Sequence, residues 1–437
     1  MVLPASGEIS FNDINIEKGG TSGTQCDMLN LSTVNINTSN PSPDRPDEVA
    51  PHSIDEFYNY DHNAGVSGDL WGWGENSSGQ VGNSSTIDLS SPVQVAAAIT
   101  NWIEAGHTQT ATVGTRASGE IYSWGNSNSQ GLLGRGVAVS DISPIQIGVL
   151  ADWETISGNH FAGSAAAPHF VGVKTDGTLW AWGNNAVGQL GDGTTTNRSS
   201  PVQIGALTTW VAAKAGDGFT VAVKSDGTLW TWGESLYSSL GNSQNTTDES
   251  SPIQVGALTN WTEKIATSGR NVVAVKSDGT LWTWGYNDWG ENGDGTSRQT
   301  GGTGAENASP VQVGALTNWD KPFGGTLYAG CTKTDGTMWT WGYNANGNLG
   351  HGGTVSVSSP VQVGSLTDYS QGDAGGRQHT YFIRTNGTLW GCGRNDGGFL
   401  ATGGTPGVDV CSPTQVGSAT NWVKIFAGYD THHALRS

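Results

Sequence analysis

The sequence is poor in basic residues and in charge of either sign. It holds 19 Lys and Arg against 38 Asp and Glu, and charged residues make up 13% of its 437 positions. The formal net charge of −19 disfavours attraction to nucleic-acid phosphates, which requires clustered basic side chains. We therefore expect no nucleic-acid partner and a surface composed mainly of Ser, Thr, Asn, Gln and Gly.

Cysteine is also scarce, and its spacing excludes the common metal motifs. The four residues Cys26, Cys331, Cys392 and Cys411 form no C-x-x-C pair and no Cys/His pattern typical of zinc. Two of them align with apolar positions in other copies of a repeat, described below, so we expect Cys331 and Cys392 to be buried free thiols. The sequence predicts neither a metal site nor a cofactor.

Long apolar runs are missing as well. No segment approaches the roughly 18 apolar residues of a transmembrane helix. The first residues, MVLPASGEISFNDIN, lack both the basic region and the apolar run of a secretion signal. We expect no membrane insertion.

Glycine and tryptophan are abundant instead. The chain holds 66 Gly and 19 Trp. Gly supplies turns between many short strands, and each Trp supplies roughly 150–250 Å² of surface to bury. This composition predicts a layered, aromatic core.

One motif recurs along the chain and organises it. In its clearest form it reads AVKSDGTLWTWG, from Ala222 to Gly233, and seven related copies can be counted. Their turn-and-tryptophan cores are Gly68–Gly74, Gly119–Gly125, Gly177–Gly183, Gly227–Gly233, Gly279–Gly285, Gly336–Gly342 and Gly387–Gly393. The second Trp of each core, replaced by Cys392 in the last, recurs after 50 to 58 residues. A period near 50 with four strand-like runs is typical of a propeller blade.

The Asp-Gly pair within the motif predicts a β-hairpin. Asp226-Gly227 separates two short alternating runs, and this dipeptide tolerates the positive φ of a tight primed turn. The chain ends also align within one copy: His433–Ser437 overlays Val221–Ser225, and Ser67 begins where that overlay stops. We therefore predict an all-β, seven-bladed β-propeller, closed by pairing of the N- and C-terminal strands within one blade.

These repeats resemble those of the regulator of chromosome condensation family. The resemblance covers residues 64–437 and is strongest at Asp176–Gly191, DGTLWAWGNNAVGQLG. It implies a seven-bladed propeller. Because the family includes exchange factors, enzyme inhibitors and interaction modules, it leaves the function open.

Residues 1–63 differ in composition and are predicted to be a small irregular docking segment. Their leader, Leu3–Ser10, and the unit Ser53–Tyr58 resemble the N-terminal module of tailed-phage virion proteins. The alternative is a generic polar leader. The candidate anchor residues are Ile9, Phe11, Ile54, Phe57 and Tyr58.

Binding residues are expected where the copies differ. Two long loops, Asn159–His169 and Gly293–Ala308, are predicted to project from one face, opposite the Asp-Gly turns, and insertions on one face of a repeat array often mark its binding face. Trp289 lies outside the repeated Trp positions. The alternative is that these are merely tolerated insertions. The candidate contact residues are Asn159, His160, Phe161, His169, Trp289 and Arg298.

The sequence shows no arrangement of catalytic groups. We find no nucleophile elbow, no phosphate loop and no paired catalytic carboxylates, so we expect no enzyme. Asp192 and Asp294 are interpreted as turn residues rather than calcium ligands. His432 and His433 are adjacent in a predicted strand and should point to opposite faces, which argues against a shared metal site.

The preferred functional hypothesis is a virion-associated interaction protein of a tailed phage, assembled in the host cytoplasm. Residues 1–63 would dock to other virion proteins within an oligomeric particle, and the propeller would present its loops to a host surface glycan or protein. One alternative is a protein-binding regulator or inhibitor, which predicts acidic and aromatic residues clustered on one face. A glycan-active enzyme is a third hypothesis.

Overall fold

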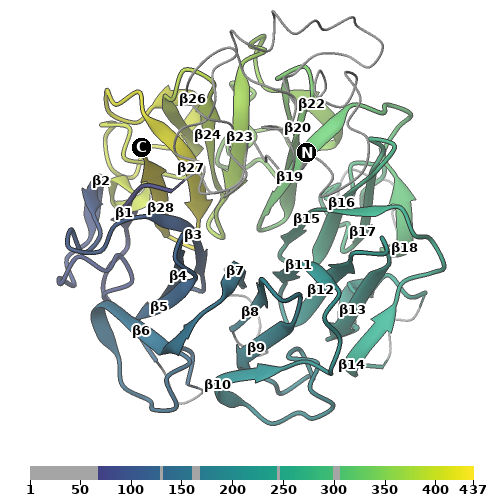
Figure 1. Ribbon diagram of the computed structural model, residues 1–437. Coiled ribbons are helices and arrows are strands. Elements are labelled where there is room, and N and C mark those ends of the chain that lie inside the picture. Colours follow the sequence, from purple (N-terminus) through teal and green to yellow (C-terminus); the bar gives the residue numbers. More distant parts are fainter. Residues whose placement is uncertain (1–66, 128–130, 160–167, 244–246, 299–305) are drawn as a thin grey trace, which may run out of the picture. The chain divides into compact units, whose positions relative to one another are not determined.

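The propeller consists of seven four-stranded antiparallel sheets. Figure 1 shows the sheets arranged in a ring. The structure is a computed structural model, and it describes residues 67–127, 131–159, 168–243, 247–298 and 306–437. Asp69–Ser437 form one compact unit. The predicted seven-bladed all-β fold is confirmed.

We number the blades in chain order, with blade 1 beginning at β3 and blade 7 containing both β27 and β1. The innermost strands are β3 (Trp102–His107), β7 (Trp153–Gly158), β11 (Trp210–Ala215), β15 (Trp261–Ser268), β19 (Trp319–Gly325), β23 (Tyr369–Ala374) and β27 (Trp422–Ala427). The second strands are β4 (Ala111–Arg116), β8 (His169–Lys174), β12 (Phe219–Lys224), β16 (Asn271–Lys276), β20 (Tyr328–Lys333), β24 (His379–Arg384) and β28 (Thr431–Arg436).

The third strands carry the tryptophan motif, and the fourth strands form the outer edges. The third strands are β5 (Glu120–Gly125), β9 (Leu179–Gly183), β13 (Leu229–Gly233), β17 (Leu281–Gly285), β21 (Met338–Gly342), β25 (Leu389–Gly393) and β1 (Asp69–Gly74). The fourth strands are β6 (Asp141–Ala151), β10 (Arg198–Gln203), β14 (Glu249–Gln254), β18 (Asn307–Gln312), β22 (Val357–Gln362), β26 (Val410–Gln415) and β2 (Leu89–Gln94). Two short 3-10 segments, η2 (Leu236–Ser238) and η3 (Asp396–Gly398), follow β13 and β25.

Burial explains the order of strands within a blade. Every residue of β12 is buried, because this strand lies inside the blade and both its faces are covered. The outer strand β10 is mostly exposed or half-buried and contains Pro201. Proline lacks an N–H donor, so it fits an edge strand, where no further strand pairs.

The hairpin between the second and third strands differs from the predicted turn. The Gly227 amide donates to the Lys224 carbonyl over 2.9 Å, and the Lys224 amide donates to the Thr228 carbonyl over 3.0 Å. Gly227 has a φ of +75°, whereas Asp226 has no positive φ. The prediction of a primed turn is therefore wrong. The loop is a three-residue turn completed by a left-handed glycine, in which Asp226 serves as a hydrogen-bond acceptor.

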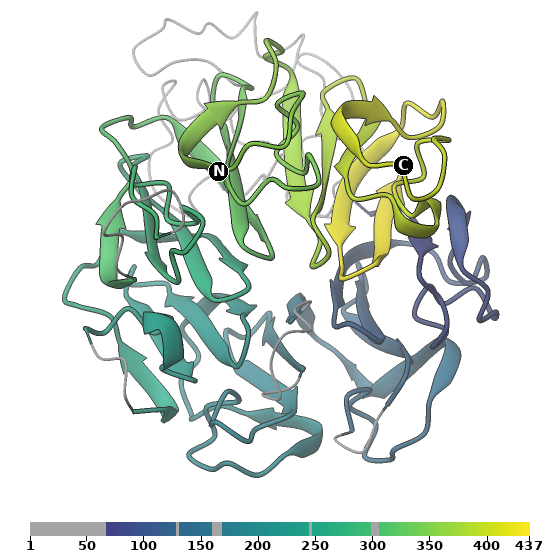
Figure 2. The ribbon, with the colours of Figure 1, turned by 180° about the vertical axis from the view of Figure 1, so that it is seen from behind.

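Blade 7 combines strands from both ends of the propeller. Its order is β2-β1-β28-β27, and β1 pairs with β28 in antiparallel register from Asp69 opposite Arg436 to Gly74 opposite Thr431. Figure 2 shows the purple first strands of the propeller beside its yellow last strands in this blade. The same register holds inside blade 3, where Leu229 lies opposite Val223.

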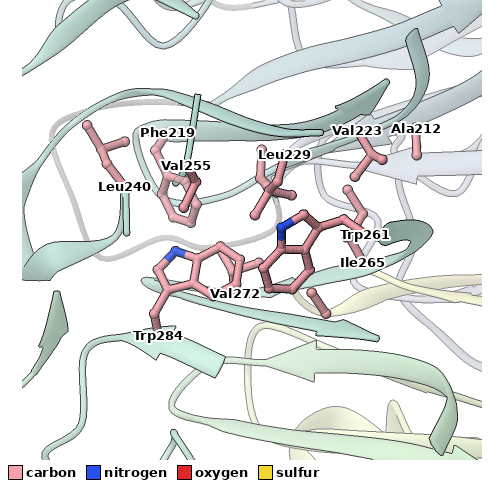
Figure 3. Packing of buried hydrophobic residues seen from close by; sticks show 12 residues of the cluster. Ala212, Phe219, Val223, Leu229, Leu240, Val255, Trp261, Ile265, Val272 and Trp284 are labelled. Carbon is pink, nitrogen blue, oxygen red and sulfur yellow. The ribbon is translucent and has the colours of Figure 1, made fainter. Parts of the chain in front are cut away.

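The core lies mainly between neighbouring blades and is aromatic. In Figure 3, Phe219 and Leu240 of blade 3 face Trp261 and Trp284 of blade 4. The Trp284 indole N–H donates to the Ser239 carbonyl of the previous blade over 3.0 Å. The Trp284 indole thus buries a large apolar surface and also satisfies its polar group, which fixes the spacing of these two blades.

Both cysteine positions singled out in the sequence are buried. Cys331 and Cys392 are free thiols with no exposed surface, which confirms the prediction for them. None of the helical segments in the described residues is long and apolar enough to cross a membrane.

Candidate functional site

The loops after the first and third strands of each blade lie on one face, which we call the loop face. On it, side chains from blades 3, 4 and 5 form a cluster of acidic, aromatic and arginine residues. We call it the loop-face cluster, and it comprises Asp217, Glu234, Tyr237, Arg270, Tyr286, Asp288, Trp289, Glu291, Arg298 and Tyr343.

The cluster begins with an ion pair between two blades. Arg270, in the turn before β16, places its Nε 3.1 Å from Oδ2 of Asp217, in the turn before β12. The Asp217 side chain is 2% exposed. Burial raises the pKa of Asp217 to about 6, and the Arg270 guanidinium opposes that rise. A buried carboxylate held by one cation makes this contact sensitive to any change at Arg270.

Aromatic rings continue the cluster from this ion pair. The Arg270 guanidinium carbon lies 4.2 Å from the centroid of the Tyr237 ring, within range of a cation–π contact. Tyr237 packs edge-to-face on Tyr286, with ring centroids 5.2 Å apart. The Tyr286 hydroxyl donates to Oδ2 of Asp288 over 2.7 Å.

Asp288 joins the rings to the exposed edge of the cluster. Its Oδ1 lies 3.1 Å from Nη1 of Arg298, whose side chain is 57% exposed. The neighbouring Trp289 is half-buried and packs edge-to-face on Tyr343 of blade 5, with centroids 4.8 Å apart. An indole held on one side and open on the other is a common anchor of protein interfaces.

Two glutamates in the cluster have raised pKa values. Burial, followed by repulsion from Asp217, raises the pKa of Glu234 to about 7. Burial raises the pKa of Glu291 to about 8, although its Oε2 accepts a 2.8 Å hydrogen bond from the Trp289 amide. Perturbed carboxyl groups beside half-buried rings mark a candidate functional site.

Backbone strain accompanies the cluster at one position. Tyr237 and Ser238 have φ values of +64° and +61°, a backbone conformation that residues other than glycine rarely adopt. Ser238 aligns with Gly188 of blade 2, which has a φ of +79°. The loop therefore keeps its conformation without the glycine, and Tyr237 remains over Arg270.

The candidate residues that were predicted from the sequence fall into three groups in the structure. Trp289 and Arg298 belong to the loop-face cluster. His169 has no exposed surface, and its Nε2 lies 2.8 Å from the Thr220 hydroxyl, while Asn159 is 3% exposed. These two residues pack in the core rather than on a binding surface, because β8 begins at His169 and is covered on both faces. The residues outside the described ranges are His160, Phe161, Ile9, Phe11, Ile54, Phe57 and Tyr58.

Sequence reasoning missed most of the cluster. The available signal was a comparison of the loops that follow the third strand. Tyr286 and Tyr343 align with Asn184, and Tyr237 aligns with Trp289 at a position held by Val187 in blade 2. Asp217 and Arg270 carry no comparable signal, because their pairing depends on contact between blades.

The two adjacent histidines point to opposite sides, as predicted. Nδ1 of His433 lies 2.7 Å from Nε2 of His107, whereas the His432 ring lies 4.5 Å from that of His379. Burial lowers the pKa of His433 to about 4. Within the described residues, no group of three His, Cys, Asp or Glu side chains is placed to hold a metal ion.

Comparisons with known proteins match the repeat pattern. The model of the "Regulator of chromosome condensation (RCC1) repeat" matches residues 67–113, 176–223 and 335–383. The ultraviolet-B receptor UVR8 of Arabidopsis thaliana is 30% identical over 366 residues, which are 80% of this chain and 66% of that protein. The human E3 ubiquitin-protein ligase HERC2 is 28% identical over 78% of this chain, but the match spans only 7% of HERC2.

Solved structures agree on the fold. Prp20p of Saccharomyces cerevisiae has a TM-score of 0.72 and 16% identity, over 85% of this chain and 92% of that one. Human WBSCR16 also has a TM-score of 0.72, with 18% identity over 85% of this chain and 99% of that one. At these identities the likeness concerns the fold alone.

Proposed function

Since this chain is a propeller built from regulator of chromosome condensation (RCC1) repeats, we propose that it is a non-enzymatic regulator that binds a protein partner through its loop face. The observation that carries the proposal is the loop-face cluster, in which acidic and aromatic side chains of three blades meet beside the half-buried Trp289. Aromatic and arginine anchors of this kind dominate the energetics of protein interfaces. This is the arrangement that the regulator hypothesis predicts.

Relatives support protein binding without naming the partner. The Prp20p structure is described together with its binding to Gsp1p and histones, and Prp20 has also been solved bound to Kap60. These partners are properties of the yeast protein. For this chain they support only the general mode of action, in which a propeller of this fold binds another protein.

The chemistry of the cluster selects a partner that presents a cationic side chain. Glu234 is half-buried, and its pKa of about 7 leaves it partly protonated at neutral pH. A Lys or Arg placed beside it would stabilise the carboxylate and lower that pKa. Binding would therefore release a proton, and Trp289 would supply apolar contact elsewhere on the loop face.

Site-specific photocrosslinking tests the proposal. A photoreactive amino acid in place of Trp289 should crosslink one partner protein, with one partner molecule per propeller. The same probe at Ser225, which is exposed on the opposite face, should crosslink no partner. With the purified partner, Trp289→Ala should weaken binding by more than tenfold, as expected for an interface anchor. Calorimetry in buffers of different ionisation enthalpy should detect the released proton. Equal capture from both positions, or unchanged affinity of the Trp289→Ala variant, would refute the loop face as the binding surface.

The virion hypothesis depends on residues 1–63, which lie wholly outside the described ranges. The relatives compared above are proteins of plants, yeast and humans, and they give that hypothesis no support. Docking of the leader to a particle therefore stays a prediction from the sequence. A mass-spectrometric inventory of purified particles from the source would decide it directly.

A further inference from the structure

The contact between blades 5 and 6 departs from the pattern of the other blades. In most interfaces the second Trp of the third strand packs against a glycine of the preceding blade. A Cβ added at Gly241 would lie 2.6 Å from Nε1 of Trp284, and one at Gly293 would lie 2.8 Å from Nε1 of Trp341. At the corresponding place in blade 6 the indole is absent, because the residue is Cys392. A Cβ at Gly350 would instead lie 3.3 Å from the Cys392 sulfur.

Two further exchanges accompany the loss of this tryptophan. The innermost strand of blade 6 begins with Tyr369, where β11 begins with Trp210. Phe382 stands where blade 3 has Ala222, and its ring packs on Tyr369 with centroids 5.6 Å apart. Both Phe382 and Cys392 are fully buried.

A cavity of about 490 Å³ opens at this interface. Its walls include Gly350, His351, Val363, Tyr369, Trp390 and Pro413. Two aromatic rings and several apolar side chains thus line it, and the described residues around it include no Asp, Glu, Lys or Arg. Cavities of roughly 300–1,000 Å³ with mainly apolar walls and a few polar groups are typical of small-molecule sites. Walls of this composition favour a neutral, flat and apolar ligand.

His351 is the polar group with the best-defined role in this cavity. Its Nε2 lies 2.9 Å from the Thr340 hydroxyl and 3.3 Å from the Val361 carbonyl. A carbonyl oxygen only accepts hydrogen bonds, so Nε2 carries the hydrogen and Nδ1 is left as an acceptor. Burial lowers the pKa of His351, which keeps the ring neutral at pH 7. A ligand with an N–H group would complement this acceptor.

We propose that the cavity between blades 5 and 6 binds a small, neutral aromatic molecule that carries a ring N–H. Indole is the simplest member of this class, because its flat ring suits a cavity whose walls include the rings of Tyr369 and Trp390. The proposal is independent of protein binding at the loop-face cluster. It assigns a role to Tyr369, one of the positions at which blade 6 departs from its neighbours.

Titration with indole, followed by ligand-observed NMR and thermal unfolding, tests the proposal. The native protein should bind indole saturably and unfold at a higher temperature in its presence. The double variant Val361→Phe/Tyr369→Trp enlarges two side chains that line the cavity and should fill it, raising the dissociation constant at least tenfold. The matched control Cys331→Ala changes a buried thiol of blade 5 outside the cavity and should bind as the native protein does.

A second variant keeps the test valid if the double variant fails to fold. Leu366 lines the cavity and is 40% exposed, so Leu366→Trp should block the cavity without disturbing the core. 1-Methylindole, which lacks the N–H, should bind less tightly than indole. The proposal would be overturned if native protein did not bind indole up to its solubility limit, or if both filled variants bound it normally. Equal affinity for indole and 1-methylindole would overturn the assigned hydrogen bond.

Discussion

Arg270 shows how much one residue contributes to the loop-face cluster. It neutralises the buried Asp217 carboxylate of blade 3 and stacks on Tyr237. Through these contacts one side chain couples the turn before β12, the loop after β13 and the turn before β16. Most of the ion pair is shielded from water, so its loss cannot be compensated by solvent as it would be on an open surface.

Replacement of Arg270 therefore tests the cluster at the level of a single residue. Arg270→Ala should lower the free energy of unfolding by about 3 kcal/mol at pH 7, because it leaves the Asp217 carboxylate buried and unpaired. Denaturant titration measures this change. In the double variant Asp217→Asn/Arg270→Ala the unpaired charge is gone, so most of the loss should be recovered. A double variant as unstable as the single one would show that the charge is not the cause.

The buried carboxyl groups also predict how stability depends on pH. The pKa values of Glu291, Glu234 and Asp430 are raised by burial to about 8, about 7 and about 7. The folded protein binds these protons more tightly than the unfolded chain, so the free energy of unfolding should fall as pH rises from 6.5 to 8. Below pH 6.5 the neutral buried His169 and His433, with pKa values of about 3 and about 4, oppose this trend.

Thermal unfolding at a series of pH values tests this prediction. We expect the highest midpoint near pH 6 and a decrease towards pH 8. Glu291→Gln removes the one of these three carboxyl groups with the highest pKa, so it should reduce the fall of the unfolding midpoint between pH 7 and 8. A midpoint that rises over this interval in the native protein would contradict the assignment.

The repeated hairpin joins the second and third strands in blades 1 to 6. In blade 3 the Asp226 carboxylate accepts hydrogen bonds from the Thr228 amide and hydroxyl, over 3.0 and 2.6 Å. The Trp230 indole donates to the same Thr228 hydroxyl over 2.8 Å, and the Lys224 ammonium lies 3.5 Å from the Trp230 ring centroid. The motif thus forms its own hydrogen-bonded turn and positions its first tryptophan.

The turn glycine provides a matched pair of substitutions. Gly227 has a positive φ, and a Cβ added there would lie 2.2 Å from the Thr259 carbonyl oxygen. Gly205 also has a positive φ of +64°, but nothing lies within 4 Å of an added Cβ. Gly205→Ala should cost about 1–2 kcal/mol from backbone strain alone. Gly227→Ala should cost clearly more, as measured by denaturant unfolding, and equal costs would show that the close contact relaxes freely.

At the scale of the whole molecule, side-chain bonds connect all neighbouring innermost strands of the ring. Each of the seven contacts between blades has at least one such bond. The residues that provide them are Glu104, Ser157, Thr267, Lys264, Lys321, Asp373 and Lys424. Because each blade is held on both sides, we expect the ring to unfold as one cooperative unit.

Two truncations test this cooperativity and the separation of the leader. Removal of residues 431–437 deletes β28, leaves β1 paired only with β2 and exposes the interface of Trp73. We expect that variant to lose cooperative unfolding. Removal of residues 1–63 should leave a folded propeller with an unchanged unfolding midpoint. Under the virion hypothesis, this shortened protein should no longer enter particles. Incorporation of this shortened protein at the normal level would contradict the docking hypothesis.

The sequence by itself determined the repeat, the number of blades and the burial of Cys331 and Cys392. These features are encoded within about 50 residues, because alternating apolar positions and turn residues specify a blade locally. The turn type was misjudged, since Asp-Gly fits both a primed turn and a three-residue turn with a left-handed glycine.

The tertiary structure alone decided which varied residues act together. Asp217 and Arg270 meet although 53 residues separate them, and the cavity beside Gly350 is lined by residues of two neighbouring blades, among them Val363 and Tyr369. Contacts between blades join positions one repeat apart, where side chains differ from copy to copy. Their sizes and charges become meaningful only when packing brings them together, so no local pattern reveals them.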